Sequence, residues 1–110
     1  MKIEVFQRTD FSWFATLKDD SGNLLNLAGA SVLFLVKDRE AFIEKTIGDG
    51  ITVVDEEAGE IRIDFSSDDL NHRISKNRFE LLIVDIENKR YISDQGSFVI
   101  NESLGVNKDL

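Results

Sequence analysis

Short apolar stretches, separated by turns rich in Gly, Asp and Asn, constrain the fold of this chain more than any other sequence feature. Residues 31–37 and 78–86 are strand-length runs dominated by Val, Leu, Ile and Phe, and residues 61–65 alternate apolar with polar side chains. Alternation at every second position is typical of a strand with one buried face. The same patterns predict further strands at residues 3–6, 11–17, 51–54 and 91–100. The sequence therefore predicts an all-β domain, a β-sandwich of about seven antiparallel strands.

Three segments depart from the strand pattern. Residues 38–49 mix charged and apolar side chains and predict one short edge strand. Residues 66–70 place two Ser before two Asp, the chemistry of a helix N-cap, and predict one short helical turn. Residues 101–110 are mostly polar and predict a C-terminal tail. We expect one sandwich domain over residues 1–100, followed by that tail.

Charge and cysteine content exclude several function classes. The chain has 13 Lys and Arg against 21 Asp and Glu, a formal net charge of −8, and it has no Cys. An acidic chain repels phosphate backbones, so we expect no nucleic-acid partner. No signal-peptide pattern and no apolar run of about 18 residues is present, so we expect a protein that is made in the cytoplasm, is not exported and has no membrane partner. Disulfides and thiol chemistry are excluded.

Two acidic pairs are candidates for metal binding. They are Asp19 with Asp20, and Asp68 with Asp69. Calcium loops space their acidic ligands and end on Glu, and neither pair has that pattern. Asp and Ser favour turns because they bond their own backbone, so we interpret both pairs as turn residues. No metal site and no cofactor are predicted.

Catalytic candidates are equally sparse. Ser66, Ser67 and His72 supply the atoms of a hydrolytic triad, but a triad is defined by geometry, and no Gly-x-Ser-x-Gly elbow is present. His72 is the only histidine and is interpreted as a surface loop residue. We predict no catalytic residue and no enzymatic activity.

One pattern exceeds what a sandwich needs. Residues 32–36 and 81–84, with Ile86, are apolar on both faces of the strand, whereas a two-layer sandwich buries one face of each strand. If alternate residues point inward, the remainder form an outer apolar stripe, made of Leu33, Leu35, Leu82, Val84 and Ile86. The stripe is either covered within the chain, by a bulge, by residues 38–49 or by the tail, or it is an intermolecular interface. Both interpretations remain open at this point.

Several segments resemble, in order, the N-terminal domain of phage baseplate upper proteins and related small tail modules. These segments are LKDDSG at 17–22, LNLAGA at 25–30, VLFLVKD at 32–38, GITVVD at 50–55, AGEIRI at 58–63, SSDDL at 66–70, FELLIVD at 79–85 and GSFVI at 96–100. The resemblance spans roughly residues 5–100, and its motifs are turn and strand signatures. Arg78 and Glu80 flank Phe79 where the family pattern has Gly before an aromatic residue.

The resemblance implies an immunoglobulin-like β-sandwich that acts as a building block of a phage or prophage virion. The expected role is a tail or baseplate connector, adaptor or decoration module, binding copies of itself, other phage structural proteins, or both. The alternative is a ligand-binding module, for a carbohydrate or host surface, that uses loops at one end of the sandwich. An exposed Trp13 would favour that alternative, whereas a buried Trp13 would favour the structural role.

Overall fold

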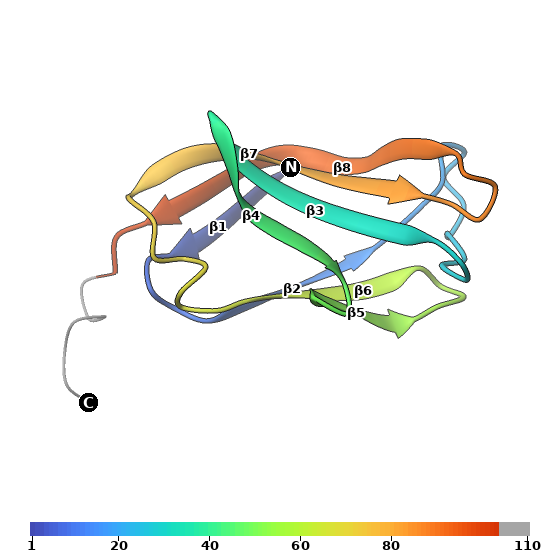
Figure 1. Ribbon diagram of the computed structural model, residues 1–110, viewed down its shortest axis with the longest axis horizontal. Coiled ribbons are helices and arrows are strands. Elements are labelled where there is room, and N and C mark those ends of the chain that lie inside the picture. Colours follow the sequence, from blue (N-terminus) through green and yellow to red (C-terminus); the bar gives the residue numbers. More distant parts are fainter. Residues whose placement is uncertain (104–110) are drawn as a thin grey trace.

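The computed structural model describes residues 1–103, and these residues form an all-β domain without a helix (Figure 1). The all-β prediction is confirmed. The strands are β1 (Lys2–Phe6), β2 (Phe11–Thr16), β3 (Ser31–Asp38), β4 (Glu40–Ile47), β5 (Gly50–Asp55), β6 (Glu60–Phe65), β7 (Ser75–Val84) and β8 (Arg90–Asn101). Since none of the described residues forms a helix, none forms one that could span a membrane.

The eight strands form one hydrogen-bonded sheet in the order β1-β8-β7-β3-β4-β5-β6-β2. The sheet folds into two layers: β8, β7 and β3 lie in one and β5, β6 and β2 in the other, with β4 running from the first to the second (Figure 1). The expectation of about seven antiparallel strands is corrected in two ways. There are eight strands, and the β1–β8 and β4–β5 pairs are parallel.

Strand β4 is eight residues long and lies in the middle of the sheet, so the short edge strand predicted for residues 38–49 is wrong. It pairs with β3 along most of its length, and Ile43 is buried opposite Val36. Gly48 and Gly50 have φ values of 86° and 97°, which glycine adopts readily. The tight loop that they permit places β5 parallel to the end of β4, and this transfers the chain to the second layer.

Residues 67–70 form turns and no helix, although Leu70 N donates to Ser66 O at 3.2 Å as in one turn of a helix, so the expected short helical element is corrected to a turn. The N-cap chemistry is nevertheless present: Ser66 N donates to Asp69 Oδ2 at 2.8 Å, and Asp69 N donates to Ser66 Oγ at 3.2 Å. Leu70 is fully buried, and its carbonyl accepts a hydrogen bond from Arg8 N. Packing of Leu70 and its bond to Arg8 hold the chain in a turn. The cap alone does not produce a helix, because a cap stabilises a helix only where further residues continue it.

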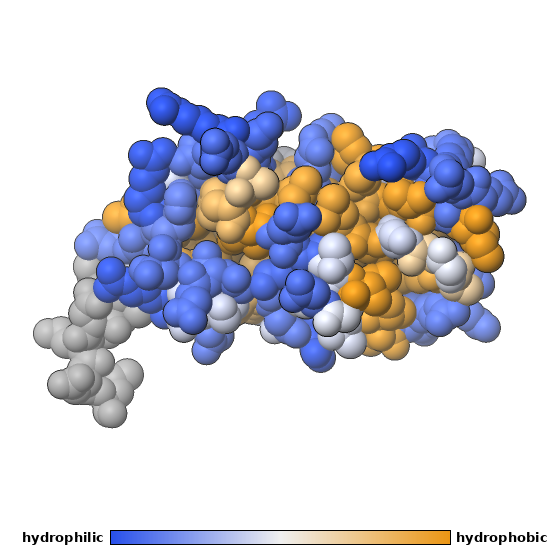
Figure 2. All heavy atoms as spheres, in the orientation of Figure 1, coloured by the Kyte–Doolittle hydropathy of each residue, from blue (hydrophilic) through white to orange (hydrophobic). Residues whose placement is uncertain are grey.

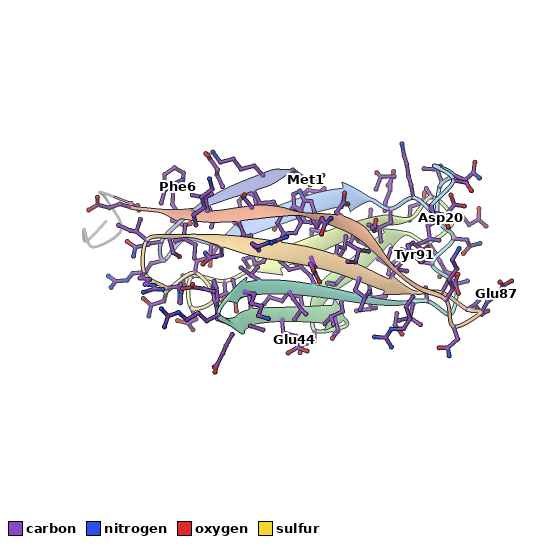
Figure 3. All side chains as sticks on the ribbon, turned by 90° about the horizontal axis from the view of Figure 1, so that it is seen from above. Met1, Phe6, Asp20, Glu44, Glu87 and Tyr91 are labelled. Carbon is purple, nitrogen blue, oxygen red and sulfur yellow. The ribbon has the colours of Figure 1, made fainter. Side chains whose placement is uncertain are left out.

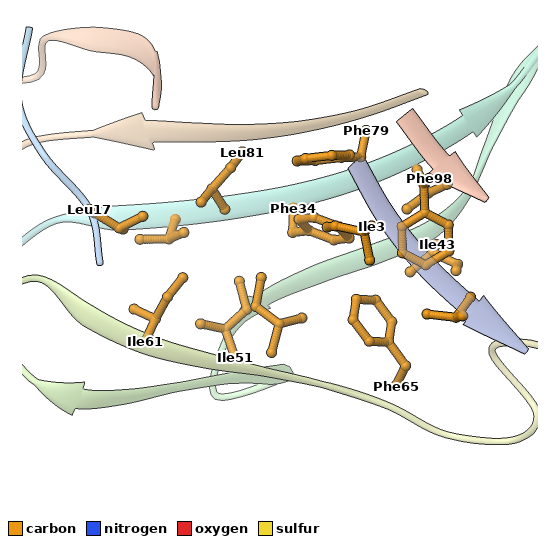
Figure 4. Close-up of a cluster of buried hydrophobic side chains, with 14 of the residues drawn as sticks. Ile3, Leu17, Phe34, Ile43, Ile51, Ile61, Phe65, Phe79, Leu81 and Phe98 are labelled. Carbon is orange, nitrogen blue, oxygen red and sulfur yellow. The ribbon is translucent and has the colours of Figure 1, made fainter. Parts of the chain in front are cut away.

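The core between the layers is built around aromatic rings (Figure 4). Phe34 is fully buried, and its ring centroid lies 5.5 to 6.3 Å from the rings of Trp13, Phe65, Phe79 and Phe98. Ring pairs at such separations add about 0.5–1.5 kcal/mol each beyond the area that they bury. These contacts join strands β2, β3, β6, β7 and β8, so the cluster holds the two layers together.

Strand β8 includes Asn101, which pairs with Phe6 on β1, so the strand extends one residue into the predicted tail. Residues 104–110, which make up most of that tail, lie outside the described residues.

Candidate functional site

The outer face of the β8-β7-β3 layer carries a row of aliphatic side chains in cross-strand register. Leu33 on β3 lies opposite Leu82 on β7, and Leu82 lies opposite Ile92 on β8. The neighbours of Leu33 and Leu82 along the strands are buried and face the core, so alternation directs this row away from it. Leu33 and Leu82 are half-buried, and Ile92 is 47% exposed. We call Leu33, Leu82 and Ile92 the aliphatic row.

Four of the five residues predicted for the apolar stripe lie on this face. Leu33 and Leu82 form its centre, Val84 lies opposite Ser31, and Leu35 lies between Glu44 and Glu80 on the neighbouring strands. Leu35 and Val84 are half-buried, like the two central leucines.

Ile86 does not join them. Strand β7 ends at Val84, and Ile86 lies in the turn to β8, where it is 74% exposed and its side chain packs beside Gly29. The strand alternation that predicted its direction stops two residues before it. The prediction of Ile86 as a stripe residue is therefore wrong.

Sequence reasoning missed two apolar side chains of the same region, Ile92 and Ile47. With Leu33, Leu82 and Val84, Ile47 lines a shallow hollow of about 460 Å³ beside β4. Figure 2 shows apolar side chains reaching the surface on the side that β4 crosses, among hydrophilic ones. Ile92 could have been found by pairing residues 78–86 with 91–100 through the intervening turn. Nothing in the sequence signals Ile47.

Charged side chains border the aliphatic row. At one end of the row, Glu44 and Glu80 lie on either side of Leu35, two residues along β3 from Leu33. At the other end, Arg90 lies opposite Val84, two residues along β7 from Leu82. Figure 3 views this layer from above, with Glu44 at the β4 margin. An apolar centre with a charged border is the usual anatomy of a protein interface.

Strand β4 does not cover this face. It lies beside β3 and extends the same sheet, so one of the intramolecular covers considered for the stripe is excluded. The single bulge of the β7–β8 pair lies between Leu81 and Leu82 and leaves Leu82 beside Ile92. The third candidate cover, the tail, lies mostly outside the described residues.

The acidic pairs contribute to turns and ion pairs. Asp19 Oδ1 accepts bonds from the backbone N–H groups of Ser21 and Asn23, each at 2.9 Å, and Lys89 Nζ lies 2.9 Å from Asp20. Burial raises the pKa of the Asp69 carboxyl, but bonds from Lys45 and from the Ser66 N–H more than offset it, so the pKa lies below its ordinary value. Within residues 1–103, no group of three or more His, Cys, Asp or Glu side chains could hold a metal ion.

The candidate triad atoms belong to different local structures. Ser66 Oγ bonds to the Asp69 backbone, whereas the His72 ring stacks on Phe42 at a centroid distance of 4.0 Å. His72 Nε2 lies 3.7 Å from Asp38, and a hydrogen bond from Arg73 lowers the pKa of the Asp38 carboxyl. His72 is thus a half-buried loop residue held by ring stacking.

Trp13, whose exposure would favour the ligand-binding alternative, faces the core, and so does Tyr91, the only tyrosine of the chain. The Trp13 ring lies 5.8 Å from Phe34 and 5.7 Å from Phe79, and Trp13 is half-buried. Tyr91 also packs against the core, and burial raises the pKa of its hydroxyl. Neither ring is presented as an open stacking platform.

Comparison with known proteins adds little to this geometry. No protein-family model matches the chain, and no curated protein matches it in sequence. A structure of murine CRIg aligns over 93% of this chain and 92% of that chain, with 10% sequence identity and a TM-score of 0.45. A TM-score below 0.5 does not establish a shared fold.

Proposed function

We propose that the domain is of the immunoglobulin-like kind. Strands β8, β7, β3 and β4 follow the order G-F-C-C′ of a variable-type sandwich, and β5, β6 and β2 follow D-E-B. Antibody domains link strands B and F by a disulfide. Here Trp13 on β2 and Phe79 on β7 meet edge to face at 5.7 Å, an apolar link between the equivalent strands.

We further propose that the domain is a structural module of a phage or prophage virion, a tail or baseplate connector, adaptor or decoration protein that acts by protein–protein association. The observation that supports this most is the aliphatic row, which is more apolar than an outer sheet face in water requires. The resemblance to baseplate modules supplies the biological setting.

Association through this face has a clear physical basis. Apolar area removed from water contributes roughly 25 cal/mol per Å². Most of the favourable free energy of association would come from the row and the adjacent hollow. The border residues Glu44, Glu80 and Arg90 would determine the orientation of the partner more than the affinity. A partner with an apolar strand face or edge fits this surface.

The test is whether the protein is incorporated into phage particles. We would complement a strain that produces the phage and lacks the chain with wild type or with Ile92→Glu, which adds a charge at an exposed end of the row. Thr52→Glu, on an exposed outward position of β5, is the matched control. We expect mass spectrometry of purified particles to detect wild type and Thr52→Glu and to show loss of Ile92→Glu. Particles without the wild-type chain would refute the virion role, and normal incorporation of Ile92→Glu would refute the role of the row.

A further inference from the structure

The two edge strands of the sheet differ in how they are protected. β1, at one edge, carries Lys2 and Glu4, whose side chains form an ion pair at 2.6 Å. β2, at the other edge, has no charged residue between Phe11 and Thr16 and pairs only with β6 among the described residues. Exposed edges without charge, proline or cover are open to pairing with another strand. β2 is therefore the unprotected edge.

The backbone of β2 is oriented for such pairing. Leu17 N donates to Gly59 O, and the β2–β6 register continues from there. Because hydrogen bonding alternates along an antiparallel pair, residues 11, 13 and 15 bond to β6. The N–H and C=O groups of Ser12, Phe14 and Thr16 consequently point to the free edge.

The side chains of β2 point to the same conclusion. Phe14 is 66% exposed on the outer face, in a strand that otherwise exposes only Ser12 and Thr16. Beside it, Val54 of β5 is also exposed, and the two line a small hollow. Burial of an exposed phenylalanine on an uncharged edge is energetically favourable, so this surface is suited to binding a partner.

We propose that β2 pairs with β2 of a second copy of this chain, antiparallel and about a two-fold axis beside Phe14. This joins the two β5-β6-β2 layers into one continuous sheet. Phe14 then lies opposite Phe14, and Ser12 lies opposite Thr16, so three residue pairs can each exchange two backbone hydrogen bonds. A two-fold arrangement closes on itself, because both β2 edges are paired within the dimer and neither can bind a third copy.

The charges at the ends of the strand select this register. Outward residues must oppose outward residues, which requires the axis to pass beside a residue and not between two residues. Centring on Phe14 brings Asp10 opposite Lys18 of the second copy, at both ends of the pair. Centring on Trp13 would place Asp10 opposite Thr16, and centring on Ala15 would place Lys18 opposite Ser12. Only the Phe14 centre matches opposite charges and an aromatic pair together.

The first experiment measures the dissociation constant of the purified full chain by sedimentation equilibrium over a wide concentration range. We expect a monomer–dimer equilibrium that Phe14→Lys weakens about tenfold or more, because the axis sets the two lysines against each other. Phe6→Lys is the matched control, since Phe6 is a 52% exposed phenylalanine on the charged edge β1. A wild-type monomer at all concentrations, or equal dissociation constants for wild type and Phe14→Lys, would overturn the proposal.

The register is tested separately. Asp10→Lys and Lys18→Asp should each weaken the dimer, and the double exchange should restore it, since opposite charges then face each other again. The chain has no Cys, so Phe14→Cys introduces a single thiol at the axis. Oxidation should link Phe14→Cys into dimers far faster than Phe6→Cys, because paired Cα atoms about 5.5 Å apart suit a disulfide. Equal rates would exclude this register.

The dimer proposal and the proposed function fail independently. If the row variant Ile92→Glu loses the dimer while Phe14→Lys keeps it, the second copy sits on the outer face and β2 pairing is wrong. If both variants dimerise normally or if only Phe14→Lys fails to dimerise, incorporation into particles still decides the virion role.

Discussion

The two layers of the sandwich share one core but differ on their outer faces. The β7 and β3 strands present Leu33, Leu35 and Leu82 outward, whereas β5 and β6 present Thr52 together with the ion pair of Arg62 and Asp64. Apart from the exposed Phe14 and Val54, the second layer alternates as a water-facing sheet should. The first layer carries apolar residues that the core does not use, and the proposed association through its outer face is based on them.

The largest expected effect separates core from outer face within one strand. Phe34→Ala should lower the free energy of unfolding by about 3–5 kcal/mol, because it leaves a cavity among four other rings. Leu33→Ala, at the next residue, should cost less than half of that, since its side chain is half-buried. Urea titrations of both variants measure this, and equal losses would mean that the outer leucines belong to the core.

A second comparison concerns two glycines with positive φ. A Cβ at Gly59 would lie 2.6 Å from Leu25 O and 2.7 Å from Leu17 O, whereas a Cβ at Gly22 meets nothing within 4 Å. Both alanine variants are strained by φ, at about 1–2 kcal/mol. Gly59→Ala should cost roughly 1–3 kcal/mol more because backbone atoms must move. Thermal unfolding of the two variants measures the difference. Similar midpoint temperatures would show that the loop at residues 17–25 can shift at little cost in free energy.

Two carboxyls, one beside each layer, should have opposite pH dependence. The Asp69 pKa lies below its ordinary value of 3.8, so its contribution is present above that pH and is lost as pH falls through the folded-state pKa. Burial raises the pKa of Asp94, so its ionisation destabilises the fold as pH rises through that higher pKa. At pH 7, Asp69→Asn should lower and Asp94→Asn should raise the free energy of unfolding.

Denaturant titrations between acid and neutral pH test both signs. The loss in Asp69→Asn should shrink below pH 3.8, and the gain in Asp94→Asn should vanish once the wild-type carboxyl is protonated. A gain for Asp94→Asn that persists in acid would mean that packing, not charge, explains it.

The smallest effect is expected on the polar outer face. Arg62 and Asp64 form an exposed ion pair at 3.1 Å. Such pairs contribute about 0–1 kcal/mol, so Arg62→Gln should change the free energy of unfolding by no more than that and should weaken any dependence on salt. A larger loss in urea titrations at low and high salt would show that this face is organised as tightly as the core.

Sequence reasoning succeeded where the information was local. The strands at residues 31–37 and 61–65 were recognisable because successive side chains of a strand point to opposite faces, a pattern that depends only on neighbouring residues. The direction of Leu33 and Leu82 followed from the same period. The predicted direction of Ile86 was wrong because the two-residue period holds only inside a strand. Where β7 ends depends on the following turn, in which Ile86 packs against Gly29.

The strand pattern, the apolar core positions, the turn chemistry and the excess of aliphatic residues in residues 32–36 and 81–86 could all be deduced from the order of amino acids, because each depends on neighbours a few positions apart. The neighbours of each strand could not. The central place of β4, the parallel pairing of β1, the alignment of Leu33 with Leu82 and Ile92, and the free edge of β2 arise from contacts between distant segments. Such contacts are selected by the packing of the whole sandwich, in which a strand's burial and hydrogen bonding depend on every other strand at once.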